Sequence, residues 1–235
     1  MRNYIVFNGV SSAEFGLFVG GQESFNAPKK KVTKVSVPGR NGDLIIDQGA
    51  FENISVAYNI VGMDGFQKNI EKIKEWLLSP NSYARLEDSY DPCTYRMGIV
   101  SAGINFTLYR LNQTGKARIT FDCKPQKYLV GGTLQNKIES GDSLYNPTSF
   151  KSSPLIHVNG YGTLTIGDEN IEIADDYQEI YIDSDIMDCY SGSSNANSSV
   201  TFQSNEFPKL APGDNNITFD NTISEVFITP RWWTL

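Results

Sequence analysis

The chain has 235 residues, and its 40% hydrophobic and 12% aromatic residues are enough for packed cores, which excludes a wholly disordered protein. No stretch approaches the ~20 consecutive apolar residues that a membrane span needs, so we expect a soluble protein without membrane insertion. The net charge of −7 is uneven: residues 1–130 contain 16 Lys and Arg against 12 Asp and Glu, and residues 131–235 contain 4 against 15. This asymmetry predicts two separately folded domains, 1–130 and 131–235, and argues against nucleic-acid binding by the acidic second one.

Alternating apolar and polar residues recur along the chain and predict antiparallel strands that bury one face. The first apolar segment, at residues 4–7, is too short for the core of a signal peptide and predicts a strand. The alternation is clearest at residues 54–60 and 117–123. In the second half it predicts a hairpin across residues 164–173 and a strand over 179–183. The fold is therefore expected to be mainly β.

One helix is predicted between Asp64 and Pro80. Its apolar residues recur at helical spacing: Phe66, Ile70, Ile73 and Leu77. Asp64 and Gln67 fit a capping box, and Pro80 ends the helix after Ser79. The domain boundary is expected between Pro125 and Asn146, around Gly131-Gly132, and the polar residues 191–199 predict a mobile loop.

No catalytic constellation emerges from the sequence. The single histidine, His157, lies in a predicted strand and is expected to be a strand residue with an ordinary hydrogen bond. No Gly-x-Ser-x-Gly nucleophile motif accompanies it, and Cys93, Cys123 and Cys189 are too scattered for a zinc site or a disulfide framework. We expect a protein that is not an enzyme and needs no cofactor.

An acidic cluster contains Asp183, Asp185 and Asp188. It lacks the glycine and the later glutamate of an EF-hand loop. A solvated turn is the favoured interpretation, a weak calcium site is the alternative, and the role of these residues stays open.

Several turn-rich segments, in this order, resemble one family. They are Val37-Pro38-Gly39-Arg40-Asn41-Gly42-Asp43-Leu44, residues 86–92, Ser153-Pro154-Leu155-Ile156 with Gly160-Tyr161-Gly162, residues 207–217 starting Phe207-Pro208-Lys209-Leu210, and the closing Pro230-Arg231-Trp232-Trp233. The set is similar to the distal tail protein (Dit) family of long-tailed bacteriophages that infect Gram-positive bacteria. The resemblance covers nearly the whole chain.

The resemblance implies a ring-forming N-terminal α+β domain, with antiparallel sheets plus a helix, and a C-terminal galectin-like antiparallel β-sandwich. It also implies a homohexameric hub in the virion, made in the host cytoplasm. This hub would join the tail tube protein to the tail-tip protein and contact receptor-binding proteins. The chain is too short for an inserted arm or carbohydrate-binding module in the second domain.

Three residues are candidates for interfaces. Arg40 lies between two glycines that permit a sharp turn, and it is either a solvated turn residue or the partner of a neighbouring subunit's carboxylate. Trp232 and Trp233 face opposite ways in an extended chain. Either one Trp closes the sandwich and the other covers an interface, or a bent chain packs both within one domain.

An alternative function is a carbohydrate-binding module that recognises cell-wall glycans. Four tyrosines are candidates for stacking on sugars: Tyr161, Tyr177, Tyr181 and Tyr190. Tyrosine in half-buried strands more often serves packing.

Overall fold

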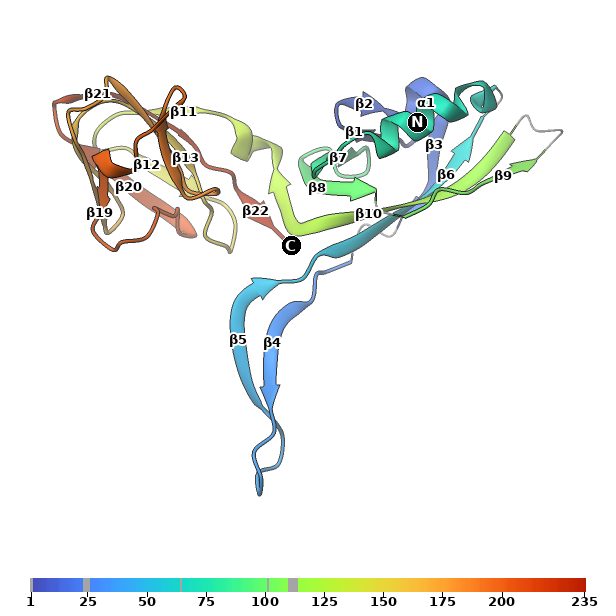
Figure 1. The fold of residues 1–235 in the computed structure, drawn as a ribbon, viewed down its shortest axis with the longest axis horizontal. Coiled ribbons are helices and arrows are strands. Elements are labelled where there is room, and N and C mark those ends of the chain that lie inside the picture. Colours follow the sequence, from blue (N-terminus) through green and yellow to red (C-terminus); the bar gives the residue numbers. More distant parts are fainter. Residues whose placement is uncertain (1, 23–25, 64, 101, 110–113) are drawn as a thin grey trace. The chain divides into compact units, whose positions relative to one another are not determined.

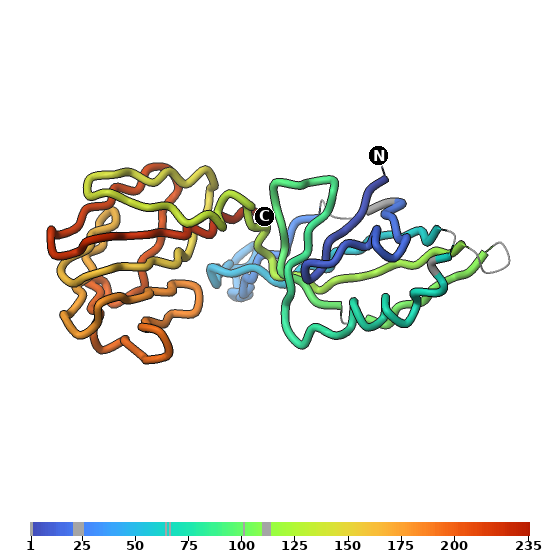
Figure 2. Tube along the Cα trace, turned by 90° about the horizontal axis from the view of Figure 1, so that it is seen from above, coloured from blue at the N-terminus to red at the C-terminus, as the bar shows by residue number. Residues whose placement is uncertain are grey.

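A computed structural model gives the fold and describes residues 2–22, 26–63, 65–100, 102–109 and 114–235 (Figures 1 and 2). Contacts divide the chain into two compact units. The first contains residues up to Lys127, together with Leu235, and the second is Tyr128–Thr234. Each unit has its own cluster of buried apolar side chains.

The first unit is built on an antiparallel sheet. Its strands are β1 (Ile5–Phe7), β2 (Val10–Ser11), β3 (Leu17–Gln22), β6 (Ile54–Gly62), β7 (Ala84–Asp88), β8 (Thr94–Val100), β9 (Phe106–Tyr109) and β10 (Thr114–Leu129). They follow the order β2-β1-β7-β8-β10-β6-β3, and β9 also pairs with β10. The alternation predicted at 54–60 and 117–123 becomes the β6–β10 pair, in which Phe121 lies opposite Val56 and both side chains are fully buried. These two predictions are confirmed.

A short helix covers one face of this sheet. The 3₁₀ turns η1 (Ser12–Phe15) and η2 (Phe66–Asn69) and the α-helix α1 (Ile70–Leu78) are the helical elements of the first unit. Ile73 and Leu77 are buried as predicted, and Trp76 adds a hydrogen bond from its indole N–H to the Phe7 carbonyl, 2.8 Å away. The helix ends before Pro80, as expected.

The start of the helix differs from the prediction. Gly65, in a left-handed conformation, precedes the 3₁₀ turn η2. The α-helix α1 begins after Asn69, and neither of these two starts has a side-chain cap. Asp64, half of the expected capping box, lies outside the described residues, as does the side chain of Phe66. The tight first turn is 3₁₀ helix, so the regular α-helix is shorter than the sequence pattern suggests.

Two strands of the first unit form a separate hairpin (Figure 1). They are β4 (Lys30–Val35) and β5 (Leu44–Phe51), which pair with each other in antiparallel orientation. Among the described residues, neither pairs with any other strand. Lys30 begins β4 and forms an ion pair with Asp47 of β5.

The second unit contains two antiparallel sheets. One has the order β11-β21-β13-β16-β17-β18, with β11 (Asn136–Ile138), β21 (Ile223–Thr229), β13 (Leu155–Gly160), β16 (Glu179–Asp183), β17 (Asp188–Ser191) and β18 (Ser194–Asn195). The other has the order β12-β20-β14-β15-β19, with β12 (Ser143–Asn146), β20 (Gly213–Phe219), β14 (Gly162–Ile166), β15 (Glu169–Ile173) and β19 (Val200–Phe202). The turns η3 (Val130–Thr133) and η4 (Asn197–Ser199) and the strand β22 (Trp233–Thr234) complete the unit.

Both sheets contribute side chains to one core. Ile156 and Ile182 come from the first sheet and Leu164 and Ile217 from the second, and all four are fully buried. The predicted hairpin is β14–β15, with Leu164 opposite Ile171. Successive strand residues point to opposite faces, so each sheet turns its apolar face to the other.

The predicted mobile loop at 191–199 is wrong. It contains β18 and η4, and Ala196 is fully buried. The Asn197 side chain accepts a hydrogen bond from the Cys189 backbone N–H at 2.8 Å and donates one to Asp188 at 2.7 Å. The composition suggested a loop because Ser and Asn are turn residues, but their side chains bind the backbone here and fix it.

Candidate functional site

The tip of the β4–β5 hairpin carries Arg40. Gly39 and Gly42, which flank it, have φ of 80° and 79°, in the left-handed region that favours glycine. The Arg40 N–H donates to the Val37 carbonyl at 3.1 Å and closes the turn. The predicted sharp turn is confirmed. Arg40 is exposed together with the other tip residues, and both alternatives for it, a solvated turn residue or the partner of a neighbouring subunit's carboxylate, stay predictions.

Apolar residues follow directly after the tip. Ile45 is 63% exposed and Ile46 is 50% exposed, and Leu44 and Val35, opposite each other in the hairpin, are also exposed. Because neighbouring residues of a strand point to opposite faces, the hairpin shows apolar side chains on both faces. A two-stranded ribbon with no face on a core has little stability of its own. This hairpin is therefore the described surface best suited to assembly with another chain.

The two tryptophans have different environments in the second unit. Trp232 is buried in the core, and its carbonyl accepts a hydrogen bond from Leu129 N–H at 2.9 Å. Trp233 is half-buried, stacks on Phe150 with 4.3 Å between ring centroids, and donates its indole N–H to the Lys151 carbonyl. Arg231, in a left-handed conformation, bends the chain just before them. Both rings thus contact residues of their own unit, and an interface role for Trp233 stays a prediction.

The predicted solvated turn around Asp183 is wrong for Asp183 itself. This residue is buried, and the Arg231 guanidinium donates to both of its carboxylate oxygens, at 2.5 and 2.9 Å. Burial raises the pKa of Asp183, but the Arg231 hydrogen bonds and charge, with backbone N–H groups, outweigh it and leave the pKa below its ordinary value. Asp188 accepts hydrogen bonds from asparagine side chains, and Asp185 is exposed.

His157 is a strand residue, as predicted. Its Nε2 lies 3.1 Å from a carboxylate oxygen of Glu179, and its ring stacks on Tyr181 at 4.2 Å. The stack continues to Phe227 on one side and, through Tyr181, to Tyr190 on the other, with rings within 17° of parallel at each step. The residues are direct cross-strand neighbours on β21, β13, β16 and β17.

The aromatic stack decides which of the candidate tyrosines could stack on a sugar. The rings face one another across the strands, and Lys137 lies over Phe227 at the end of the row. The faces of Tyr181 that a sugar would need are covered by His157 and Tyr190. Tyr181 is therefore a packing residue, and Tyr190 has one face covered as well.

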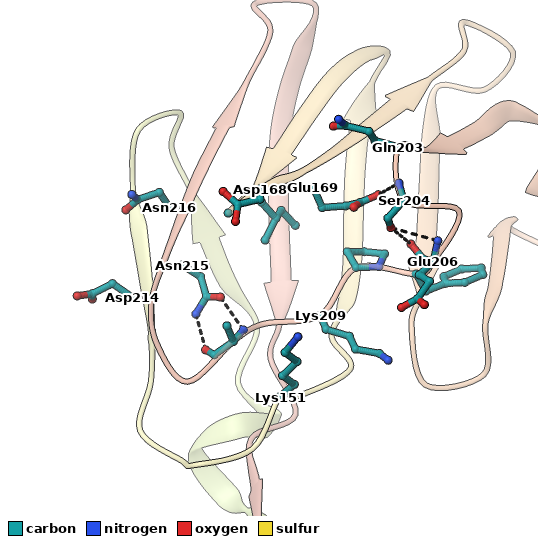
Figure 3. Close-up of a pocket in the computed structure, with 15 residues that line it drawn as sticks. Lys151, Asp168, Glu169, Gln203, Ser204, Glu206, Lys209, Asp214, Asn215 and Asn216 are labelled. Atoms are coloured by element: carbon teal, nitrogen blue, oxygen red, sulfur yellow. Dashed lines mark hydrogen bonds between the residues drawn. The ribbon is translucent and has the colours of Figure 1, made fainter. Parts of the chain in front are cut away.

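One cavity of the second unit has a volume of about 790 Å³ (Figure 3). Its lining is polar and mixed in charge: Lys151, Lys209, Asp168, Glu169, Glu206 and Asp214 are among its residues. Several lining groups hold the surrounding loops together. Asn215 accepts from Ala211 N–H at 2.7 Å and donates to the carbonyls of Leu144, Ala211 and Gly213, and Glu169 accepts from Ser204 N–H. The cavity presents no nucleophile paired with a base among its described lining.

In the part of the chain that the structure describes, no three His, Cys, Asp or Glu side chains are grouped to hold a metal ion. No described helix is both long and apolar enough to span a membrane.

Comparison with known proteins gives matches among solved structures only. No protein-family model and no curated protein matches the chain. The crystal structure of phage SPP1 Dit (gp 19.1), described as a paradigm of the hub adsorption apparatus in Gram-positive infecting phages, matches over 100% of both chains with a TM-score of 0.71 and 11% identity. The chain has a Dit-like fold. Chains of the phage P2 baseplate in its activated conformation, with Ca and with Sr, match over 97% of both chains at 12% identity, with TM-scores of 0.55 and 0.54.

These matches confirm the Dit resemblance at the level of the fold. The mainly β architecture, with one α-helix among the described residues, follows the expectation. Sequence reasoning missed the hairpin, because its strands lack the alternation that a buried face imposes. The exposed run Leu44-Ile45-Ile46 beside a Gly-rich turn was the available signal.

Proposed function

We propose that this chain is the distal tail protein of a long-tailed phage of a Gram-positive host, a virion structural component and not an enzyme. The observation that supports it is the match to the SPP1 hub protein over the full length of both chains. Baseplate chains of phage P2 add a second tail structure with the same fold. In this proposal, the two compact units are the two expected domains, and the second is a galectin-like sandwich.

The assembly that we propose is a homohexameric ring. Six copies of the first unit form it, joined through the β4–β5 hairpin, and the ring connects the tail tube protein to the tail-tip protein. The exposed apolar side chains of Leu44, Ile45 and Ile46 give the hairpin a reason to bind a neighbouring copy. Its synthesis would take place in the host cytoplasm before incorporation into the tail.

Arg40 is assigned a role at the tip of the hairpin in this assembly. An exposed guanidinium on a sharp turn can bind a carboxylate of the neighbouring copy through two hydrogen bonds. Arg40→Glu is expected to reduce the fraction of hexamer, in favour of smaller species, in native mass spectrometry. An unchanged hexamer in that variant would contradict this role for Arg40.

Light scattering after size-exclusion chromatography tests the proposed ring. Purified full-length protein is expected to elute with six times the mass of the 26.2 kDa chain. Adding the tail-tip protein is expected to shift this peak to a larger complex. A chain that stays monomeric at high concentration, with and without that protein, would contradict the proposal.

A further inference from the structure

A second cavity of the second unit has a volume of about 460 Å³, within the usual range of small-molecule sites of ~300–1,000 Å³. Two of the four candidate tyrosines, Tyr161 and Tyr177, line it together. Neither of them stacks on another ring among the described residues, unlike Tyr181 and Tyr190. Tyr161 is the exposed ring of the two, whereas Tyr177 is partly buried, packs against the core of the unit and donates its hydroxyl to the Asn195 carbonyl at 3.4 Å.

Tyr161 lies between two glycines with positive φ angles. They are Gly160 and Gly162, whose φ angles are 110° and 124°. A Cβ on Gly160 would lie 2.3 Å from the Thr222 carbonyl, and one on Gly162 would lie 2.7 Å from the Thr222 hydroxyl. Only glycine fits on both sides, and the result is a tyrosine that is 41% exposed at the cavity. Glycine in a strand is typical of a bulge or of a close approach by another backbone, and the β13–β21 register does shift between Asn159 and Gly160.

Tyr177 lies on a loop that is fixed at both ends. Asp176 accepts a hydrogen bond from the Ser199 hydroxyl at 2.8 Å, and the Gln178 carbonyl accepts one from Gly160 N–H at 3.0 Å. The second bond ties the loop of Tyr177 directly to the Gly-Tyr-Gly segment. Two of the segments that line the cavity are therefore joined to each other by a backbone hydrogen bond.

The lining also selects for charge. Asp175, Asp176 and Gln178 contribute carboxylate and amide groups, and Thr222 and Ser224 contribute hydroxyls. Its lining residues include no Lys, Arg or His, and they belong to a strongly acidic half of the chain. An anionic ligand would be repelled, while a ligand rich in hydroxyl donors would find acceptors.

We propose that this cavity binds a neutral saccharide. The apolar C–H face of a sugar ring would stack on the exposed ring of Tyr161, and the sugar hydroxyls would donate to Asp175 and pair with the Gln178 amide. A compact cation would also suit a carboxylate beside aromatic rings, but it would leave the amide and the hydroxyls without a role. The site does not depend on the proposed ring, because every group comes from one copy of the second unit.

A glycan array tests the proposal with the full-length protein. The array carries neutral, amino-bearing and acidic oligosaccharides of varied linkage. The wild type is expected to bind neutral members, and Tyr161→Ala is expected to weaken that binding by at least about tenfold, the cost of one lost stacking contact. Tyr161→Phe keeps the ring and is expected to bind nearly as well as the wild type.

Two further variants separate a binding role from a folding role. Asp175 is exposed, so Asp175→Asn removes an acceptor without touching the core and is expected to weaken binding at unchanged thermal stability. Tyr145→Ala is the matched control, because Tyr145 is 62% exposed on β12 and lines none of the cavities described above. Binding confined to amino-bearing glycans, binding that survives Tyr161→Ala, or no binding to any neutral glycan would overturn the proposal.

Discussion

The ion pair between Asp183 and Arg231 shows how one residue can be judged wrongly from its neighbours in sequence. Asp183 lies among acidic residues, yet its partner is 48 residues away in the closing segment. Only 9% of the Asp183 side chain is exposed, so the pair is largely out of water. Removing one member of such a pair leaves the other charge unpaired, which costs more than the pair itself contributes.

Asp183→Asn is expected to lower the free energy of unfolding of the second unit by about 2 kcal/mol at neutral pH. The measurement is hydrogen exchange of β13 and β16 peptides in increasing urea. Asp185→Asn, an exposed change in the same segment, is the control and should change the free energy little. Equal stability of the two variants would show that the ion pair does not stabilise the unit.

The same pair predicts a pH dependence. The folded-state pKa of Asp183 lies below the unfolded value of about 3.9. The ion pair therefore makes its full contribution to the free energy of unfolding above that pH. The contribution disappears as the pH falls through the lowered pKa, because protonated Asp183 no longer attracts Arg231. The difference in unfolding free energy between wild type and Asp183→Asn is therefore expected to shrink below about pH 4. A constant difference down to strongly acidic pH would contradict this explanation.

The backbone of Trp232 lies very close to Gly132. A Cβ on Gly132 would lie 2.4 Å from the Trp232 backbone nitrogen, whereas one on Gly131 would meet nothing within 4 Å. Gly132→Ala is expected to lower the melting temperature through a loss of roughly 1–3 kcal/mol, the usual cost of overpacking. Gly131→Ala, the neighbouring control, should leave it nearly unchanged. Equal melting temperatures for both variants would show that the close approach is relaxed at little cost.

At the scale of elements, the sequence predicted those parts whose side chains face a core. β6, β10 and the β14–β15 hairpin were predictable because burial of one face imposes a period of two. The β4–β5 hairpin was not, since residues without a buried face need no alternation. The Tyr161–Tyr177 cavity could not be predicted either, because its segments are distant in sequence and are brought together by the β13–β16 pairing, which the Gly160–Gln178 hydrogen bond extends.

The hairpin is expected to control assembly without controlling the fold. Ile45→Asp with Ile46→Asp places charges at exposed positions, so the melting temperature should change little while the oligomer dissociates. Light scattering measures the mass. Ile186→Asp is the control, because Ile186 is 61% exposed in the second unit and should leave the oligomer intact. A doubly substituted chain with the wild-type mass would exclude the hairpin as the assembly element.

At the scale of the whole molecule, the same fold is built from largely different residues. Only 11% of positions are identical to SPP1 Dit, although both chains match over their full length. Packed cores accept many apolar combinations of similar volume, so a fold can outlast recognisable sequence. The resemblance seen in the sequence was carried by turns instead, where Gly39, Gly42 and Gly160 adopt backbone conformations that favour glycine.

The most direct test of the central proposal is electron microscopy of the purified full-length protein. Negatively stained particles are expected to average into rings with six-fold symmetry, and the Ile45→Asp, Ile46→Asp variant is expected to show separate small particles. Wild-type fields that contain only single small particles, under conditions where the chain is folded, would contradict the account.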